Sequence, residues 1–168
     1  MDFKTVLSDY GPMLGRIVAS YEADPAQQQE VLQEISLALW QALPKFRGDG
    51  SLKAFVARVA QNRAVSHVAK SAGQPRRSEL DENLACVADG PEATLEKEQQ
   101  RLMLLEAVRG LPLNLRQVTT LALEGFSHRE IAETLGISEN NAMVRFARAK
   151  EALKLAMVRT TRERGGVS

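Results

Sequence analysis

The sequence predicts an all-α protein of two small helical domains joined by a flexible linker, the second domain being a helix-turn-helix domain. Apolar residues recur at helical spacing along most of the chain, and no stretch alternates convincingly as a strand would. The 168 residues are 44% apolar but only 5% aromatic, which suits small helical units built on Ala, Leu and Val. The periodicity breaks once, over residues 71–91, a polar acidic stretch with two glycines and two prolines. The predicted domains are therefore 1–70 and 92–168, with 71–91 as the linker.

The N-terminal domain is expected to begin with two helices. The first covers about residues 3–21, and Gly11-Pro12 should bend or interrupt it. The second runs from about 25 to 43, because Asp24 can cap it, Pro25 suits the first helical position and Pro44 stops it. The apolar stripe of the second helix is Val31, Leu32, Ile35, Leu39 and Leu43.

A third helix is expected after a glycine-containing turn over residues 45–50, with Ser51 as its cap. Its predicted inner face is Leu52, Phe55, Val56 and Val59. The opposite face is predicted to be basic and to carry Lys53, Arg58, Arg63, His67 and Lys70.

The C-terminal domain is expected to open with a helix over about 92–110 whose inward residues are Leu102, Leu105 and Val108. A turn at Leu111-Pro112 leads to a short apolar helix over about 115–124, and the helix-turn-helix follows.

Residues 124–153 have the pattern of two helices joined by a short turn. Ser127 and Glu130 can form a capping box on the first helix, and Gly136 suits the left-handed turn that ends it. Ile137 can fill the angle between the helices, and Ser138 can cap the second helix, which can continue as a basic tail to residue 164.

The second helix of this motif carries the groups that a helix in the major groove of DNA needs. Amides and guanidinium groups near its N-terminal end can meet base edges, and cations further along can meet phosphates. The predicted DNA-binding residues are Ser138, Asn140, Asn141, Arg145, Arg148 and Lys150. The alternative for this segment is an ordinary helical hairpin with a solvated basic face.

The net charge of +1 is low for a protein that holds DNA unaided. Residues 1–70 carry a net charge of +1, residues 71–97 carry −3 and residues 98–168 carry +3. Because phosphate neutralisation supplies most non-specific affinity, we expect weak unaided binding and a partner with DNA contacts of its own.

Several classes of protein are not expected. The chain has no apolar run near 18 residues and no signal peptide, so membrane insertion is not predicted. Cys86 is the only cysteine, which excludes an internal disulfide, favours the cytoplasm and leaves Cys86 a bystander in a loop. The two histidines, His67 and His128, lack metal-ligand spacing, and no phosphate loop or nucleophile motif is present. The sequence therefore predicts no enzyme, no metal and no cofactor.

Two segments, residues 33–70 and 111–153, together resemble the bacterial extracytoplasmic-function (ECF) sigma factors, the two-domain members of the sigma-factor family. The first segment resembles the family's second conserved region through Gln33-Glu34, Leu39-Trp40, Leu43-Pro44, Phe46, Gly50-Ser51 and Ala60-Gln61-Asn62-Arg63-Ala64. The second resembles its fourth region through Leu111-Pro112, Arg116, Glu130-Ile131-Ala132, Leu135-Gly136-Ile137-Ser138 and Arg148-Ala149.

The resemblance implies that the chain binds core RNA polymerase and directs it to promoter DNA. The C-terminal domain would read the upstream (−35) element, and the N-terminal domain would read and open the −10 element. The residues expected to bind the polymerase are Glu30, Gln33, Glu34, Leu37 and Trp40, although Trp40 suits a core position equally well.

Opening of the −10 element needs a stacking platform and phosphate contacts. Phe46 or Phe55 can supply stacking and Asn62 base-edge hydrogen bonds. The expected cationic contacts are Lys53, Arg58, Arg63, His67 and Lys70. The alternatives are core positions for Phe46 and Phe55 and a structural hydrogen bond for Asn62.

The chain departs from the family at the recognition helix, where the family commonly has Thr-Val-Lys-Ser before Arg. Here Asn141-Ala142-Met143-Val144 precedes Arg145, which removes one lysine and about one phosphate contact. Asn141 is predicted to compensate by reading adenine.

The resemblance also implies an anti-sigma factor that wedges between the domains. The acidic linker permits such a clamp, and a plain tether is the alternative. The competing function is a stand-alone dimeric helix-turn-helix regulator. Such a regulator would not need the segment 33–70, and the low net charge suits a polymerase subunit better than an independent DNA-binding protein.

Overall fold

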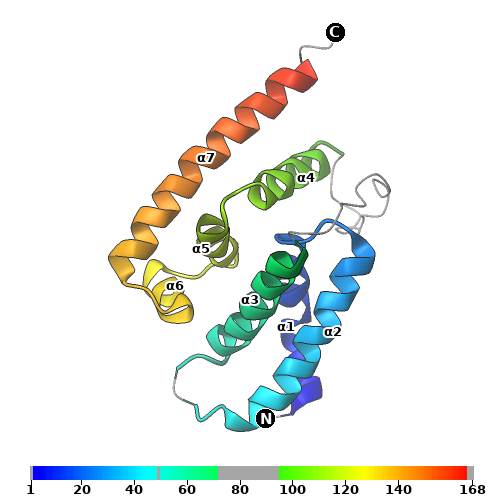
Figure 1. Cartoon of the computed structure of the whole chain (residues 1–168), viewed down its shortest axis with the longest axis vertical. Helices are drawn as coiled ribbons and strands as arrows, with labels where there is room; N and C mark the ends of the chain where they lie inside the picture. The colour runs from blue at the N-terminus through cyan, green and yellow to red at the C-terminus, as the bar shows by residue number, and fades with distance from the viewer. Residues whose placement is uncertain (1, 49, 72–94, 166–168) are drawn as a thin grey trace.

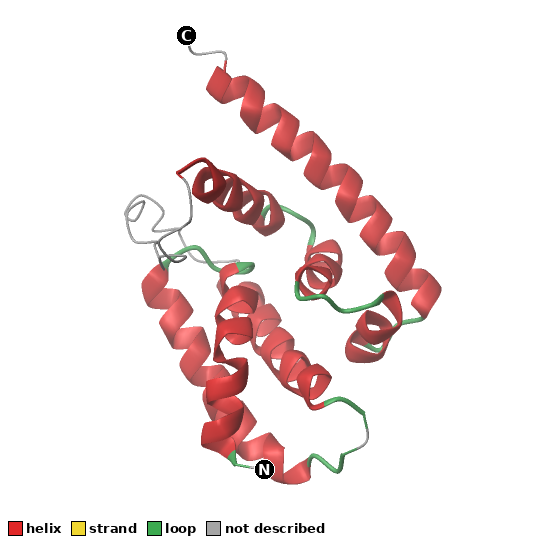
Figure 2. Cartoon of the chain, turned by 180° about the vertical axis from the view of Figure 1, so that it is seen from behind, coloured by secondary structure: helices red, strands yellow, loops and turns green. Residues whose placement is uncertain are grey.

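The computed structural model describes residues 2–48, 50–71 and 95–165, with side chains described as far as Thr160. Over these residues all regular structure is helical, which confirms the predicted all-α class (Figure 2). The elements are α1 (Phe3–Ala19), α2 (Pro25–Ala42), the short 3-10 helix η1 (Leu43–Lys45), α3 (Leu52–Ser71), α4 (Leu95–Arg109), α5 (Leu113–Leu123), α6 (His128–Leu135) and α7 (Glu139–Gly165). Ser71, predicted as the first linker residue, ends α3, and the rest of the predicted linker, with Cys86, lies outside the described residues.

Helices α1, α2 and α3 pack against one another in an N-terminal bundle (Figure 1). Asp24 Oδ1 accepts a hydrogen bond from the Ala26 N–H at 3.2 Å, and Ser51 Oγ accepts one from the Ala54 N–H at 3.2 Å, so both predicted caps are confirmed. Gly11-Pro12 does not interrupt α1, in which Pro12 is an interior residue.

The apolar stripe of α2 is buried as predicted, with only Leu32 partly exposed. The predicted inner face of α3 is only partly correct. Val56 is fully buried, whereas Leu52, Phe55 and Val59 are half-buried at the edge of the core. The buried residues of α3 are Val56, Ala57, Ala60, Gln61 and Ala64, because α3 is covered by α1 and α2 on one side and by α5 and α6 on another.

The C-terminal half has the predicted caps. Ser127 Oγ accepts from the Glu130 N–H at 3.1 Å while Glu130 Oε1 accepts from the Ser127 N–H at 2.8 Å, which completes the capping box. Gly136 ends α6 in the left-handed region at φ 71°. Helix α5 begins at Leu113, two residues earlier than predicted, with Pro112 at its N-cap position.

Leu102 in α4 is exposed and not inward-facing as predicted, whereas Val108 on the same helix is fully buried. Leu105 is partly buried.

The two halves of the chain lie against each other, with α3 beside α5 and α6 (Figure 1). Their buried residues form one continuous apolar cluster that runs from Val6 in α1 to Ala142 in α7. Arg16 on α1 reaches Glu124, just after α5, through two charge-assisted hydrogen bonds of 2.8 Å. The structure is therefore a closed arrangement of the two halves.

Candidate nucleic-acid interface

Helix α7 begins with a fixed N-terminal turn. Ser138 Oγ accepts the Asn141 N–H at 3.0 Å and so caps the helix as predicted. The N-terminal half of α7 is anchored by Ala142 and Ala149, which are completely buried against the helices beneath. A turn of this kind presents the opposite face of α7 to solvent in a defined orientation.

The predicted DNA-binding residues of α7 fall into two groups. Asn140, Arg148 and Lys150 are exposed, although the Lys150 ammonium lies 5.1 Å from the centre of the Phe146 ring. Asn141 and Arg145 are half-buried and contact each other, since Arg145 Nε donates to Asn141 Oδ1 at 3.1 Å. The carbonyl oxygen of Asn141 is thus already engaged within the helix, in contrast to the free adenine-reading amide that the sequence suggested.

Two apolar residues on the exposed face of α7 were absent from the predicted site. Met143 and Val144 have 48% and 40% of their surface exposed. The sequence could have indicated them, because Ala142 and Ala149 lie on the core face of the helix and helical periodicity then directs positions 143 and 144 away from the core.

Helix α3 presents a polar exposed face that holds three of the five residues predicted for it. Arg58, Arg63 and Lys70 are exposed as expected, and Asn62 is exposed as well. Lys53 and His67 lie instead in line with the buried Ala57, Ala60 and Ala64, since positions 53, 57, 60, 64 and 67 follow one helical stripe.

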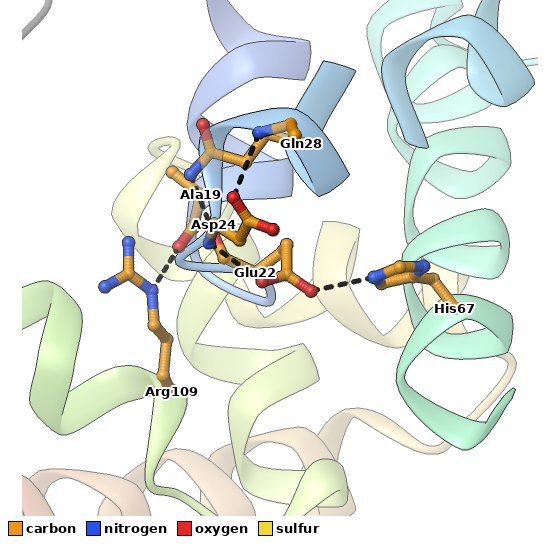
Figure 3. A network of polar contacts seen from close by, with 7 residues as sticks. Ala19, Glu22, Asp24, Gln28, His67 and Arg109 are labelled. Carbon is orange, nitrogen blue, oxygen red and sulfur yellow. Dashed lines mark hydrogen bonds and ion pairs between the residues drawn. The ribbon is translucent and has the colours of Figure 1, made fainter. Parts of the chain in front are cut away.

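His67 is held by Glu22, from the connection between α1 and α2 (Figure 3). Its Nε2 lies 2.8 Å from Glu22 Oε1, and only 10% of its side chain is exposed. Glu22 also accepts the Asp24 N–H through Oε2 at 2.8 Å, which orients the carboxylate. The expectation that His67 lies on an open basic face is therefore corrected.

The C-terminal end of α1 is tied to α4. Arg109 Nε donates to the Ala19 carbonyl at 2.8 Å (Figure 3). Burial lowers the pKa of Arg109, and the nearby Glu22 carboxylate opposes that shift. These contacts join the N-terminal bundle to the C-terminal helices.

Lys53 is engaged across the junction between the two halves. Its Nζ donates to the Glu124 carbonyl at 3.0 Å and lies 5.0 Å from the centre of the Phe126 ring. In this arrangement one of the three N–H donors of the Lys53 ammonium is engaged at the junction of the two halves.

Phe46 and Phe55 form an aromatic pair beside the turn that precedes α3. Their ring centroids are 5.0 Å apart with the planes tilted by 48°. Both rings are half-buried, and Phe55 packs against the core. The pair therefore lies at the edge of the core, neither fully buried nor fully exposed.

Helix α2 has an exposed apolar patch on the side away from its core stripe. Leu37 and Trp40 have 57% and 61% of their surface exposed, so Trp40 is not a core residue. Glu30, Gln33 and Glu34 are also exposed on this helix. An exposed Trp beside an exposed Leu is typical of a protein-binding surface.

Each half of the chain matches a known protein-family model. Residues 6–73, which include most of α1 and all of α2 and α3, match the family model for Sigma-70 region 2. Residues 101–153, which run from α4 into α7, match the model for Sigma-70, region 4. The chain belongs to the sigma-70 family of sigma factors, with region 2 followed by region 4.

Curated relatives of this sigma factor span nearly its full length. The RNA polymerase sigma-H factor of Pseudomonas aeruginosa is 28% identical, with 94% of this chain and 86% of that protein covered. The ECF RNA polymerase sigma-E factor of Escherichia coli K12 is 27% identical, with 90% of this chain and 84% of that protein covered.

Two solved structures share the fold. The sigma factor RpoE in complex with the anti-sigma factor NepR from Bartonella quintana superposes with a TM-score of 0.72 at 20% identity, with 93% of this chain and 96% of that chain covered. CnrH in complex with the cytosolic domain of CnrY superposes with a TM-score of 0.68 at 21% identity, with 91% and 85% covered.

None of the described helices of this sigma factor is both long enough and apolar enough to cross a bilayer. The last part of α7, residues 154–165, extends beyond the residues that match region 4.

Proposed function

We propose that this sigma factor binds core RNA polymerase and reads promoter DNA with two separate surfaces, α7 for the upstream element and α3 for the −10 element. The observation that carries the proposal is the helix-turn-helix geometry of α6 and α7, with Asn140 and Arg148 exposed on a capped second helix. Such a helix fits the major groove, where its amide can meet a base edge and its guanidinium a guanine or a phosphate.

The −10 surface is the exposed polar face of α3 together with the aromatic pair at its N-terminal end. Asn62 is exposed and so is available for base-edge hydrogen bonds in place of a structural one. The Phe46–Phe55 pair offers a stacking surface for an unstacked base, and Arg58, Arg63 and Lys70 are exposed for phosphate contacts.

The polymerase surface is the exposed face of α2 around Leu37 and Trp40. These side chains are the largest exposed apolar groups on α2, and their burial on docking would be favourable at about 25 cal/mol per Å² of apolar area. Burial in the polymerase complex would give both residues the apolar surroundings that the free chain does not give them.

The proposal includes a cytoplasmic location, where the polymerase acts, and a non-enzymatic role as a specificity subunit. It also includes an anti-sigma factor as a regulatory partner, supported by the likeness to a sigma factor solved with the anti-sigma factor NepR. The stand-alone dimeric regulator is disfavoured, because region 2 accounts for residues 6–73 without a dimerisation role.

The test is co-elution of the purified chain with bacterial core RNA polymerase in gel filtration. The proposal predicts co-elution at sub-micromolar concentration and its loss in the Leu37→Ala/Trp40→Ala variant. Leu155→Ala is a matched control, since Leu155 is 67% exposed on α7 but lies beyond the region 4 match. Failure of the wild-type chain to bind the polymerase under these conditions would refute the proposed function.

A further inference from the structure

Two exposed apolar side chains occupy the part of α7 that would face DNA. Met143 and Val144 lie between the exposed Asn140 and Arg148 on the N-terminal half of the helix. The opposite face at this level is anchored by the buried Ala142. Neither apolar side chain belongs to the buried core of the fold, so core packing does not explain why these positions are apolar.

The major groove offers an apolar side chain one favourable group. The base edges present hydrogen-bond donors and acceptors at every base pair, and the 5-methyl of thymine is the only apolar group among them. An apolar side chain against any other base edge would remove water from a donor or acceptor without replacing its hydrogen bond.

We propose that Met143 and Val144 determine promoter specificity by contacting thymine methyl groups in the upstream element. This inference rests on the proposed function, because it requires α7 to enter the major groove. The group selected at the base pairs beneath the two residues is the 5-methyl of thymine.

The surroundings leave the pair free to act this way. Arg145, the next residue along, is half-buried and has its Nε held by Asn141 Oδ1, so its guanidinium is drawn toward the side of the helix that bears Asn141. Adjacent helical residues differ by about 100° in direction and 1.5 Å along the axis. The two side chains therefore contact different methyl groups at neighbouring base pairs.

The two residues differ in how sharply they can select. Val144 is β-branched and holds its methyl groups in one strongly preferred rotamer within a helix. Met143 is unbranched and adapts to the surface it meets. Val144 is therefore expected to give the stricter thymine preference of the two.

The test replaces thymine by deoxyuridine, which removes the 5-methyl group and leaves every hydrogen-bonding group in place. Holoenzyme formed from the full chain and core polymerase first selects its preferred upstream element from a randomised duplex. Affinities are then measured for that duplex with each thymine in turn replaced by deoxyuridine.

Loss of a contacted methyl is expected to weaken wild-type binding about four-fold, which corresponds to about 0.8 kcal/mol per buried carbon. Val144→Ser and Met143→Gln should each bind the thymine and deoxyuridine duplexes equally at one of these positions. Both substitutions are on the exposed face, and Ser and Gln are no worse helix formers than the residues they replace.

The matched control is Val158→Ser, the same substitution at an exposed position of α7 about 21 Å further along the helix. It should discriminate thymine from deoxyuridine as the wild type does. Circular dichroism of each variant checks that the helices are intact.

Two results would overturn the inference while leaving the proposed function standing. One is equal wild-type affinity for the thymine and deoxyuridine duplexes at every upstream position. The other is wild-type discrimination retained by both Val144→Ser and Met143→Gln. Absence of holoenzyme formation, scored before any DNA is added, would refute the proposed function itself and the inference with it.

Discussion

Tyr21 and Gln61 are buried polar residues at the junction of the two halves, and they form a chain of hydrogen bonds across it. The Tyr21 hydroxyl donates to Gln61 Oε1, and Gln61 Nε2 donates to the Gln117 carbonyl at 3.1 Å. Gln61 is 1% exposed, so both of its polar groups depend on these partners. Burial raises the pKa of Tyr21, which keeps the phenol protonated and able to donate.

Tyr21→Phe is expected to lower the free energy of unfolding by about 1–3 kcal/mol, because it leaves a buried acceptor on Gln61 unpaired. Urea denaturation at neutral pH measures the change. Tyr10→Phe, at a half-buried tyrosine inside α1, is the control and should change stability by about 0.5 kcal/mol or less. A Tyr21→Phe variant as stable as the control would show that the bond contributes nothing.

The capping-box carboxylate of Glu130 makes the stability of α6 depend on pH in the acid range. Its hydrogen bonds with Ser127 lower its pKa from the ordinary value of 4.5. The folded pKa is below the unfolded one, so the stabilisation is complete above pH 4.5 and is lost as the pH falls through the folded pKa.

Glu130→Gln keeps the capping-box geometry but cannot ionise. The difference in Tm between wild type and this variant should be constant from pH 7 to pH 5 and should shrink below pH 4.5. Thermal unfolding followed by circular dichroism from pH 3 to pH 7 checks this. A constant Tm difference throughout the range would contradict the assigned role of the carboxylate.

At the scale of elements, the sequence predicted the helix-turn-helix well because its signals are local. The caps at Ser127 and Ser138 act within three residues, and the turn at Gly136 is a property of one backbone position. Helix α3 was predicted less well, since the side chains that it buries are chosen by four neighbouring helices.

Gly136→Ala tests the turn between α6 and α7. No atom lies within 4 Å of the added Cβ, so the cost comes from the left-handed backbone alone and is expected to be about 1 kcal/mol. The matched control is Gly15→Ala inside α1, also with nothing within 4 Å but with ordinary helical backbone, which should raise stability by about 0.5–1 kcal/mol. Opposite signs by chemical denaturation are expected, and equal signs would contradict the argument.

At the scale of the whole molecule, the packing of the two halves against each other engages side chains that the sequence predicted to contact DNA. Glu124 is the centre of the junction, because its carboxylate holds Arg16 and its backbone carbonyl holds Lys53. Lys53 keeps its hydrogen bond to the Glu124 carbonyl only while α3 lies against the segment that bears Glu124. A phosphate contact by Lys53, which the sequence predicted, would therefore compete with its contacts at the junction.

Arg16→Glu places two carboxylates against each other at this junction and is expected to open the chain. Small-angle scattering should show a larger radius of gyration than the wild type, and the Arg16→Glu/Glu124→Arg double variant should restore the compact value. Arg58→Glu makes the same charge change at an exposed site of α3 and should leave the radius unchanged. An unchanged radius for Arg16→Glu would contradict this role of the ion pair and would show that apolar packing alone keeps the halves together.

The sequence by itself determined the helix boundaries to within a few residues, the caps, the helix-turn-helix and the exposed amide and guanidinium groups of its second helix. These depend on neighbours three or four residues away. Only the tertiary structure decided that Lys53 and His67 are engaged and that Leu37 and Trp40 are exposed. The deciding contacts join residues far apart in the chain, 45 positions for His67 and Glu22 and 71 for Lys53 and Glu124. Helical periodicity specifies a face, but it cannot say which faces a distant helix will cover.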